Sequence, residues 1–208
     1  MRLLILGAGG HGRVVADAAE QSAAGWHEIA FLDDRYPQLA ISEPWKVVGS
    51  FADLERLAAD FADCVPAVGD ARLRLGLLAR VRTAGYEIPV ILHPRSVVSA
   101  HARLAPGSFV AAAAVVNVGC EIGEGCIINT AATVDHDCRL GAGVHVCPGA
   151  HLAGDVEIGE RAWIGIGAVA RQGLRIGADA TVGAGSVCVE NVRAGAIVSG
   201  VPAREHPK

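Results

Sequence analysis

The stretch GCEIGEGCIINTAATVDHDCRLGAGVHV, residues 119–146, belongs to a six-residue repeat that continues far on both sides. Fourteen of the sixteen residues at every sixth position from Val98 to Cys188 are Val, Ile or Leu. A period of six matches the two-residue alternation of a strand and not the 3.6-residue period of a helix. The repeat therefore predicts a solenoid of short strands, in which each unit buries its apolar residue by stacking on its neighbours. The positions are Val98, Leu104, Val110, Val116, Ile122, Ile128, Val134, Leu140, Val146, Leu152, Ile158, Ile164, Ala170, Ile176, Val182 and Cys188.

The residue two places before each of these positions is usually small, and Cys120, Cys126 and Cys138 stand there. Cys188 occupies an aliphatic position, and no Cys-x-x-Cys pair exists among the six cysteines. Cysteine at such places acts as a small buried hydrophobic residue. The pattern favours buried free thiols over zinc or disulfides.

The first ninety residues follow a different pattern. Strands are predicted over residues 2–6, 29–32, 64–68 and 87–92, and helices over residues 14–19, 51–59 and 72–83. Alternating strands and helices imply a small parallel sheet with helices on its faces. The expected organisation is a Rossmann-like domain over residues 1–92 and the solenoid over residues 93–208.

A glycine-rich loop follows the first predicted strand. Gly7, Gly9 and Gly12 satisfy the pattern G-x-G-x-x-G, and Asp33 and Asp34 follow just over twenty residues later. Such a loop lets backbone N–H groups and a helix N-terminus meet a diphosphate, while the acidic pair can accept bonds from a ribose or a base. The alternative is a tight turn without a ligand. A redox dinucleotide is disfavoured, because the unit is about half of a full dinucleotide fold.

Composition narrows the class of partner. The chain has 208 residues and a net charge of −4, without a run of Lys or Arg, which argues against nucleic acid or an anionic membrane. The apolar run at residues 1–6 is too short for a signal peptide, and no stretch approaches a membrane span. These features predict a soluble, cytoplasmic protein.

Two histidines lie near the middle of the repeat but outside its aliphatic positions. His136 follows Val134 by two residues, and His145 precedes Val146. Histidine titrates near neutrality and suits a general base, and a neighbouring carboxylate can fix its tautomer. Asp137 is the first candidate for that carboxylate and Asp135 the second. A zinc site formed by these histidines with His151 is a minor alternative, and no metal is expected.

A series of motifs in fixed order resembles the hexapeptide-repeat acetyltransferases, and among them the bacterial nucleotide-amino-sugar N-acetyltransferases and sialic acid O-acetyltransferase-like proteins. The series covers essentially the whole chain. It comprises GAGGHG at residues 7–12, LDD at 32–34, NT at 129–130, DHDC at 135–138, VHV at 144–146 and GVPAR at 200–204. The resemblance implies a left-handed parallel β-helix for the C-terminal part, a homotrimer, and acetyl-CoA as co-substrate.

The resemblance also implies roles for individual residues. The N-terminal domain would hold a nucleotide-linked amino sugar, and acetyl-CoA would lie in a groove between two subunits. His136 would be the general base, although Asp137 follows it where the family often has Glu, whose reach is longer. Ala184 stands where relatives can have glycine. The implied substrate-binding residues are Gly9, Gly10, His11, Asp33, Asp34, Gly69, Arg74 and Asn129, and the implied cofactor-binding residues are His145, Ile166, Gly183 and Ala184. The sequence leaves open whether His11 faces a phosphate or caps the turn.

The motifs and the resemblance leave three alternative functions. The first is N-acetylation of a nucleotide-linked amino sugar by direct transfer, with no covalent intermediate on Cys147, which is better explained as an ordinary buried thiol. The second is O-acetylation of a sialic acid-type sugar. The third is a metal-dependent or non-catalytic β-helix protein.

Overall fold

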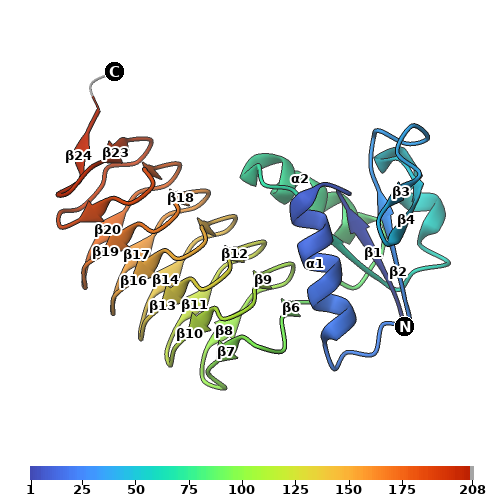
Figure 1. Cartoon of the computed structure of the whole chain (residues 1–208), viewed down its shortest axis with the longest axis horizontal. Coiled ribbons are helices and arrows are strands. Elements are labelled where there is room, and N and C mark those ends of the chain that lie inside the picture. The colour runs from blue at the N-terminus through green and yellow to red at the C-terminus, as the bar shows by residue number, and fades with distance from the viewer. Residues whose placement is uncertain (207–208) are drawn as a thin grey trace. The chain divides into compact units, whose positions relative to one another are not determined.

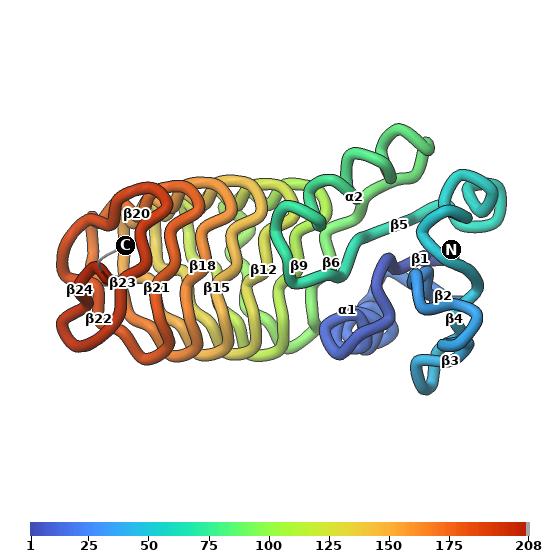
Figure 2. Tube along the Cα trace, turned by 90° about the horizontal axis from the view of Figure 1, so that it is seen from above, coloured from blue at the N-terminus to red at the C-terminus, as the bar shows by residue number. Residues whose placement is uncertain are grey.

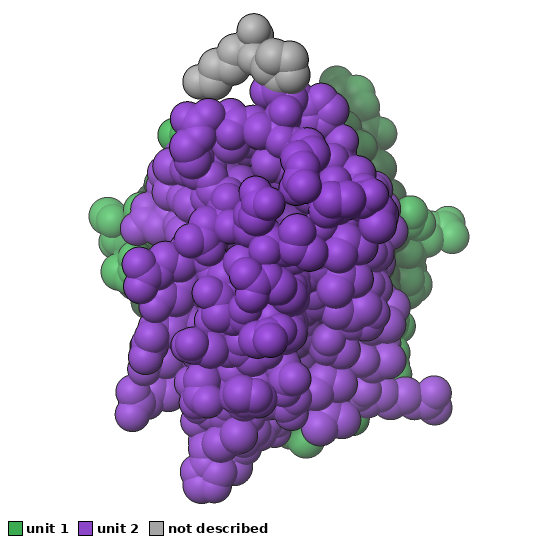
Figure 3. All heavy atoms as spheres, turned by 90° about the vertical axis from the view of Figure 1, so that its left-hand side faces the viewer, with its two compact units in different colours: residues 1–94 green, residues 95–208 purple. Residues whose placement is uncertain are grey.

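The computed structural model describes residues 1–206 and contains two compact units, Met1–Pro94 and Arg95–Lys208 (Figures 1 and 3). The first unit is a small α/β domain, and the second is a stack of short parallel strands. Among the helices of residues 1–206, none combines the length and apolar character needed to cross a bilayer.

A five-stranded sheet forms the centre of the first unit. Its strand order is β3-β4-β2-β1-β5, and all neighbours are parallel except β3 and β4. Leu3, Leu4, Ile5 and Leu6 are fully buried, as expected for a parallel strand covered on both faces. The strands are β1 (Arg2–Leu6), β2 (Glu28–Leu32), β3 (Ile41–Ser42), β4 (Trp45–Gly49) and β5 (Asp63–Pro66).

Two α-helices belong to this unit, α1 (Gly10–Gln21) and α2 (Ala71–Thr83). Helix α1 follows the carboxyl end of the interior strand β1, and α2 follows the carboxyl end of the edge strand β5. In α2, Leu77 and Val81 are buried against the residues that line one side of the sheet. Because β1 and β5 are parallel neighbours, the loops that lead into α1 and α2 lie at the same edge of the sheet.

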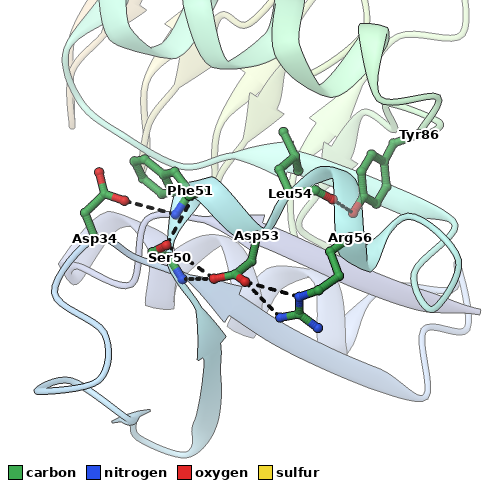
Figure 4. Close-up of polar contacts among 8 residues, drawn as sticks. Asp34, Ser50, Phe51, Asp53, Leu54, Arg56 and Tyr86 are labelled. Atoms are coloured by element: carbon green, nitrogen blue, oxygen red, sulfur yellow. Dashed lines mark hydrogen bonds and ion pairs between the residues drawn. The ribbon is translucent and has the colours of Figure 1, made fainter.

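The helix predicted over residues 51–59 is instead two short 3₁₀ segments, Phe51–Asp53 and Glu55–Leu57. Figure 4 shows why the first one starts where it does: Ser50 and Asp53 form a reciprocal capping box, and Asp34 accepts a hydrogen bond from the Phe51 N–H at 3.0 Å. The hydroxyl of Tyr86 donates to the Leu54 carbonyl at 2.6 Å. The apolar residues alone suggested a longer α-helix, but these polar contacts favour a tighter segment.

The strand predicted over residues 87–92 is confirmed only at its C-terminal end. Only Ile91–Leu92 is a strand (β6), and the five-stranded sheet does not include it. Glu87 makes one isolated bridge to Asp63. The sheet is completed by β3 and β4, which the sequence analysis missed. A cue was present, because the strand-favouring residues Trp45, Val47 and Val48 follow Pro44 in the way a strand follows a turn.

Three sheets of strands two or three residues long form the second unit, and Figure 2 shows their coils stacked in order along the chain. Each strand from β7 to β19 pairs in parallel with the strand eighteen residues later, as Thr133 pairs with His151, so one coil comprises three repeats. The first sheet contains β7 (Val97–Val98), β10 (Val115–Val116), β13 (Thr133–Val134), β16 (His151–Leu152), β19 (Val169–Ala170) and β22 (Val187–Cys188). The second contains β8 (Arg103–Leu104), β11 (Glu121–Ile122), β14 (Arg139–Leu140), β17 (Glu157–Ile158) and β20 (Arg175–Ile176). The third contains β9 (Phe109–Val110), β12 (Ile127–Ile128), β15 (His145–Val146), β18 (Trp163–Ile164), β21 (Thr181–Val182), β23 (Ile197–Ser199) and the antiparallel β24 (Arg204–Glu205).

The repeated aliphatic residues form one continuous core inside these coils. Fourteen of the sixteen are buried, while Val98 and Leu104 in the first coil are partly buried. The small residue two places earlier is also inside, as at Ala132 and Ala150. The prediction of a solenoid is confirmed, since each coil covers the apolar residues of its neighbours.

The outward residues give the first and second sheets different characters. The first sheet exposes valines, and we call it the valine face; its outward residues are Val97, Val115, Thr133, His151, Val169 and Val187. The second sheet exposes a ladder of alternating charge, Arg103, Glu121, Arg139, Glu157 and Arg175, with ion pairs between neighbouring coils. We call it the charged face.

Candidate active site

The glycines of the first loop divide into two groups. A Cβ on Gly12 would lie 1.9 Å from the Gly7 carbonyl oxygen, and Gly7 itself has φ +107°. These two glycines are therefore required by the close approach of α1 to β1. A Cβ on Gly9, Gly10 or Gly69 would meet nothing within 4 Å. Those three leave backbone open to a ligand instead.

The N-terminus of α1 is open as well. Gly9 is its N-cap, no side chain caps the helix, and its first turn contains no acidic residue. The first backbone N–H groups of a helix carry partial positive charge and attract anions. The loop at residues 9–11 therefore has the geometry of a phosphate-binding site.

Asp33 binds groups of its own domain. Its Oδ2 accepts from the Ala8 N–H at 2.8 Å and from Arg35 Nη2 at 2.8 Å, and its Oδ1 accepts from Arg35 Nε at 2.7 Å. The hydrogen bonds from Arg35 and Ala8 lower the pKa of Asp33 from 3.8 to about 2, against the effect of burial. Asp33 thus holds the glycine loop against the turn after β2, and Arg35 presents the exposed group there. Arg35 was not among the predicted site residues, although its place two residues after Asp33 was a usable cue.

Replacing Asp33 by alanine should lower the free energy of unfolding by about 2 kcal/mol at pH 7, because it removes charged hydrogen bonds and leaves the buried Ala8 N–H unsatisfied. A lowered native pKa stabilises the fold above the unfolded-state value near 3.8, and this stabilisation is lost as pH falls through about 2. Urea unfolding at several pH values measures both effects. Asp34→Ala is the matched control, since Asp34 is exposed and makes one backbone contact. A difference from wild type that stayed constant down to pH 2 would contradict this account.

Gly69, Arg74 and His11 lie at the same edge of the sheet as the glycine loop. Arg74 is only 1% exposed, and its Nη1 donates to the carbonyls of Val68 and Gly69, both at 2.8 Å. Arg74 therefore shapes the loop before α2 from the inside. Burial, followed by the charge of Arg74, lowers the pKa of His11 to about 4. His11 is neutral at pH 7 and can both donate and accept a hydrogen bond.

His136 lies at the exposed turn after β13 and forms a dyad with its neighbour. Its Nδ1 is 2.9 Å from Asp137 Oδ2, and its backbone N–H donates to Asp135 Oδ1 at 2.8 Å. Asn117 Nδ2 also donates to Asp135 Oδ1 at 2.9 Å, which holds that carboxylate against the turn. Asp137, then, contacts the imidazole ring, and Asp135 supports the backbone. With Nδ1 donating to Asp137, Nε2 is left as the proton acceptor.

The shorter reach of Asp137 does not prevent this contact. Asp137 has φ +62°, in the left-handed region, as do Gly119 and Gly173 at the equivalent turn position of other coils. Asp tolerates this conformation better than most side chains. The backbone therefore delivers a short carboxylate to Nδ1.

Removing the carboxylate with Asp137→Asn should move the pH profile. The hydrogen bond that His136 Nδ1 donates to Asp137 raises the pKa of His136 above 6.5. The neutral base therefore forms, and kcat/KM rises, as pH passes that raised value. Asp137→Asn should move this acid limb to lower pH and lower the maximal rate about 10- to 100-fold. Initial rates between pH 5 and 9 measure both, and an unmoved limb would remove Asp137 from the dyad.

His145 occupies a different environment, on the third sheet. It is 7% exposed, and its ring packs edge-on against Trp163, with 4.3 Å between the ring centres. Asn129 Oδ1 accepts from the Thr130 N–H, which turns Asn129 Nδ2 toward His145 Nε2 at 3.1 Å. Nε2 is then the acceptor and Nδ1 carries the proton. The structure thus joins Asn129, which was expected at the sugar, to His145, which was expected at the cofactor.

Ile166, Gly183 and Ala184 lie at the turns after the third sheet. Ile166 and Ala184 are exposed and occupy the same position in successive coils, where the Gly185 N–H donates to the Ile166 carbonyl at 2.8 Å. His136 lies at a turn between the first and second sheets, whereas Ile166, Gly183 and Ala184 lie at turns between the third and first sheets. These turns border the valine face on opposite edges. In one protomer, His136 and these expected cofactor positions therefore lie at different edges of the β-helix.

The cysteines lie in the core. All six are free and buried, and burial raises the pKa of the Cys147 thiol to about 12. A thiol that stays protonated at neutral pH is a poor nucleophile. Within residues 1–206, His, Cys, Asp and Glu side chains form no group of three or more that could hold a metal ion.

Comparison with known proteins identifies the class of protein to which this chain belongs. Residues 2–81 match the model of the PglD N-terminal domain. The acetyltransferase domain of PglB from Neisseria gonorrhoeae FA1090, in complex with acetyl coenzyme A, is 42% identical over 99% of this chain and 98% of that chain, with a TM-score of 0.95. A perosamine N-acetyltransferase from Caulobacter crescentus, a histidine mutant in complex with CoA and GDP-perosamine, is 39% identical over 100% and 98%, with a TM-score of 0.95. WeeI from Acinetobacter baumannii AYE is 28% identical over 99% and 100%, with a TM-score of 0.91. No curated protein sequence matches the chain significantly.

A Rossmann-like domain followed by a left-handed β-helix with a histidine–carboxylate dyad defines a hexapeptide-repeat acetyltransferase. The chain belongs to the PglD-like family of these enzymes, which includes the PglB acetyltransferase domain and perosamine N-acetyltransferase. The expected fold class and family are confirmed.

Proposed function

We propose that the enzyme transfers the acetyl group of acetyl-CoA to the amino group of a nucleotide-linked amino sugar, in the synthesis of a glycan or surface polysaccharide, with His136 as general base. The observation that carries this proposal is the dyad of His136 and Asp137 at an exposed turn, with Nε2 as acceptor. Membership of the family supports the reaction, because relatives 39–42% identical over nearly the whole chain include one bound to acetyl-CoA and one bound to CoA and GDP-perosamine.

The chemistry requires one proton acceptor. The sugar amine forms a bond to the acetyl carbon as the carbon–sulfur bond breaks, and the proton leaves the nitrogen for His136 Nε2. Asp137 stabilises the imidazolium, which then returns the proton to the CoA thiolate. A positioned general base contributes about 10²- to 10⁴-fold, and alignment of amine and thioester contributes much of the remaining acceleration.

The nucleotide would bind at the glycine loop of the first unit. The open N-terminus of α1 with Gly9 and Gly10 suits a diphosphate, and neutral His11 can bond to it without adding charge. Gly69 borders this site, and Arg74 fixes the carbonyls beside it. Asp34 and the exposed Arg35, which Asp33 holds, are the groups available to the ribose and base.

We also propose a homotrimer in which acetyl-CoA lies between two copies. His136 and the positions of Ile166, Gly183 and Ala184 occupy different edges of one β-helix, so a second copy is needed to bring a base to a cofactor. Burying the valine face costs less desolvation free energy than burying the charged face, whose ion pairs would lose their contact with water. Light scattering should give three times the monomer mass of 21.4 kDa, and a monomer would contradict the shared site.

A cytoplasmic location is part of the proposal. Six buried cysteines are all unpaired, which fits a reducing compartment. Nothing in the net charge of −4 favours binding to nucleic acid or to an anionic membrane.

The decisive experiment is an assay of free thiol release from acetyl-CoA with a panel of UDP-, GDP- and CMP-linked amino sugars. At least one should release thiol in proportion to product. Treating the product with alkali separates the alternatives, because an ester hydrolyses and an amide survives. Thiol release that never exceeds the background without sugar, over the whole panel, would contradict the proposed activity.

A further inference from the structure

Two glycines lie against the dyad from the coils on either side. Gly154 is eighteen residues after His136, and a Cβ on it would lie 2.4 Å from both Cε1 and Nε2 of the imidazole. Gly119 is eighteen residues before Asp137, and a Cβ on it would lie 2.3 Å from Asp137 Oδ1. Real side chains do not approach so closely, so a methyl group at either place would displace a member of the dyad.

Residues other than glycine occupy the equivalent turn positions in neighbouring coils. Val118 and Gln172 carry side chains at the position equivalent to Gly154, and the φ of Gly154 is outside the left-handed region. Asp155 occupies the position equivalent to Gly119 with φ +57°. Backbone geometry alone therefore leaves Gly154 unexplained, and the room it makes for the imidazole explains it. At Gly119 the positive φ already favours glycine, and the close approach of Asp137 adds a second reason for it.

We propose that Gly119 and Gly154 are positioning residues, which hold the carboxylate of Asp137 and the imidazole of His136 in the arrangement used for acetyl transfer. This inference rests on the function proposed above. Gly154 provides the surface on which the ring lies, and so sets the direction of Nε2. Gly119 provides the space in which the carboxylate reaches Nδ1.

Gly154→Ala tests the first half. The methyl group should push Nε2 away from the acceptor amine, and a misplacement of about 1 Å can cost about 10²-fold in rate. We expect kcat to fall by that factor, with the KM for both substrates and the melting temperature close to wild type. Gly76→Ala is the control, because a Cβ there meets nothing within 4 Å. A crystal structure of Gly154→Ala should show a rotated imidazole.

Gly119→Ala tests the second half against a closely matched control. Gly119 and Gly173 occupy equivalent turn positions with φ +75° and +70°, so alanine is strained to a similar extent at both. Only Gly119 abuts Asp137, since a Cβ on Gly173 meets nothing within 4 Å. Both variants should lose similar thermal stability. Only Gly119→Ala should lower kcat and move the acid limb of kcat/KM to lower pH, as Asp137→Asn does.

The outcomes separate this inference from the proposed function. If His136→Ala keeps near-full activity, His136 is not the base and the proposed mechanism fails. If His136→Ala is inactive while Gly154→Ala has wild-type kcat, or Gly119→Ala behaves as Gly173→Ala does, the positioning role is overturned. In the background of His136→Ala, Gly154→Ala should cause no further loss. An additional loss there would also count against the inference, because it would show an effect that does not pass through the ring.

Discussion

Replacing His136 by alanine is expected to lower kcat by about 10²- to 10⁴-fold, because the variant lacks the group that takes the proton from the attacking amine. The partners of the ring are the adjacent Asp137 and the surface of Gly154, so the variant should fold as the wild type does and keep its binding sites. The KM for acetyl-CoA and for the nucleotide sugar should therefore change little. The pH dependence due to the dyad should disappear together with the rate. Steady-state kinetics with both substrates varied, from pH 5 to 9, measure all three effects.

A surface histidine provides the control. His101 is exposed in the first coil and was given no role, so His101→Ala should keep wild-type kinetics. Binding of the nucleotide sugar and of CoA to His136→Ala, followed by calorimetry, should stay near wild-type affinity. A variant that kept most of its turnover would exclude His136 as the base, and one that lost substrate affinity in proportion to kcat would point to a binding role.

Replacing Gly12 by alanine is expected to have the second large effect, on both the stability and the nucleotide affinity of the first unit. The added Cβ would lie 1.9 Å from the Gly7 carbonyl oxygen and 3.3 Å from the ring of Phe31. Gly7 cannot yield easily, because its N–H donates to the Leu32 carbonyl at 2.8 Å. Helix α1 would have to move away from β1, which should cost about 3 kcal/mol of unfolding free energy.

Gly10→Ala is the informative partner of that variant. Gly10 is exposed, and a Cβ on it meets nothing within 4 Å, so this change should leave stability near wild type while it narrows the space for a diphosphate. Urea unfolding and nucleotide titration on both variants distinguish the two kinds of glycine. Equal stability of Gly12→Ala and Gly10→Ala would show that the loop relaxes and that the packing argument is wrong.

The solenoid could be predicted from the sequence because its six-residue repeat depends on residues that are close along the chain. Each hexad places one aliphatic residue such as Val134 at a fixed interval, and parallel stacking follows without knowledge of any distant residue. The first unit was harder to read. The Ser50–Asp53 capping box and the contact of Asp34 with Phe51 replaced the expected helix by 3₁₀ segments, and such contacts depend on where other loops lie.

In the candidate site, too, contacts between neighbouring residues were predictable, and contacts between distant segments were not. His136 and Asp137 were predicted as a pair, and their neighbouring positions made the contact foreseeable. Asp33 was expected to face a ligand, but the structure engages both of its oxygens with Ala8 and Arg35. Whether a carboxylate is open or already bonded depends on the approach of another segment, which no motif records.

By itself, the sequence determined the solenoid and the loop that precedes α1, and it predicted the pair of His136 and Asp137, because each depends on residues that are close along the chain. The tertiary structure decided which groups are available. It buried His145 against Trp163, engaged Asp33 with Arg35, and set Gly119 and Gly154 against the dyad from coils eighteen residues away. The physical reason is that stacking and hydrogen bonding join residues distant in sequence, so the exposure and orientation of a side chain are properties of the folded chain.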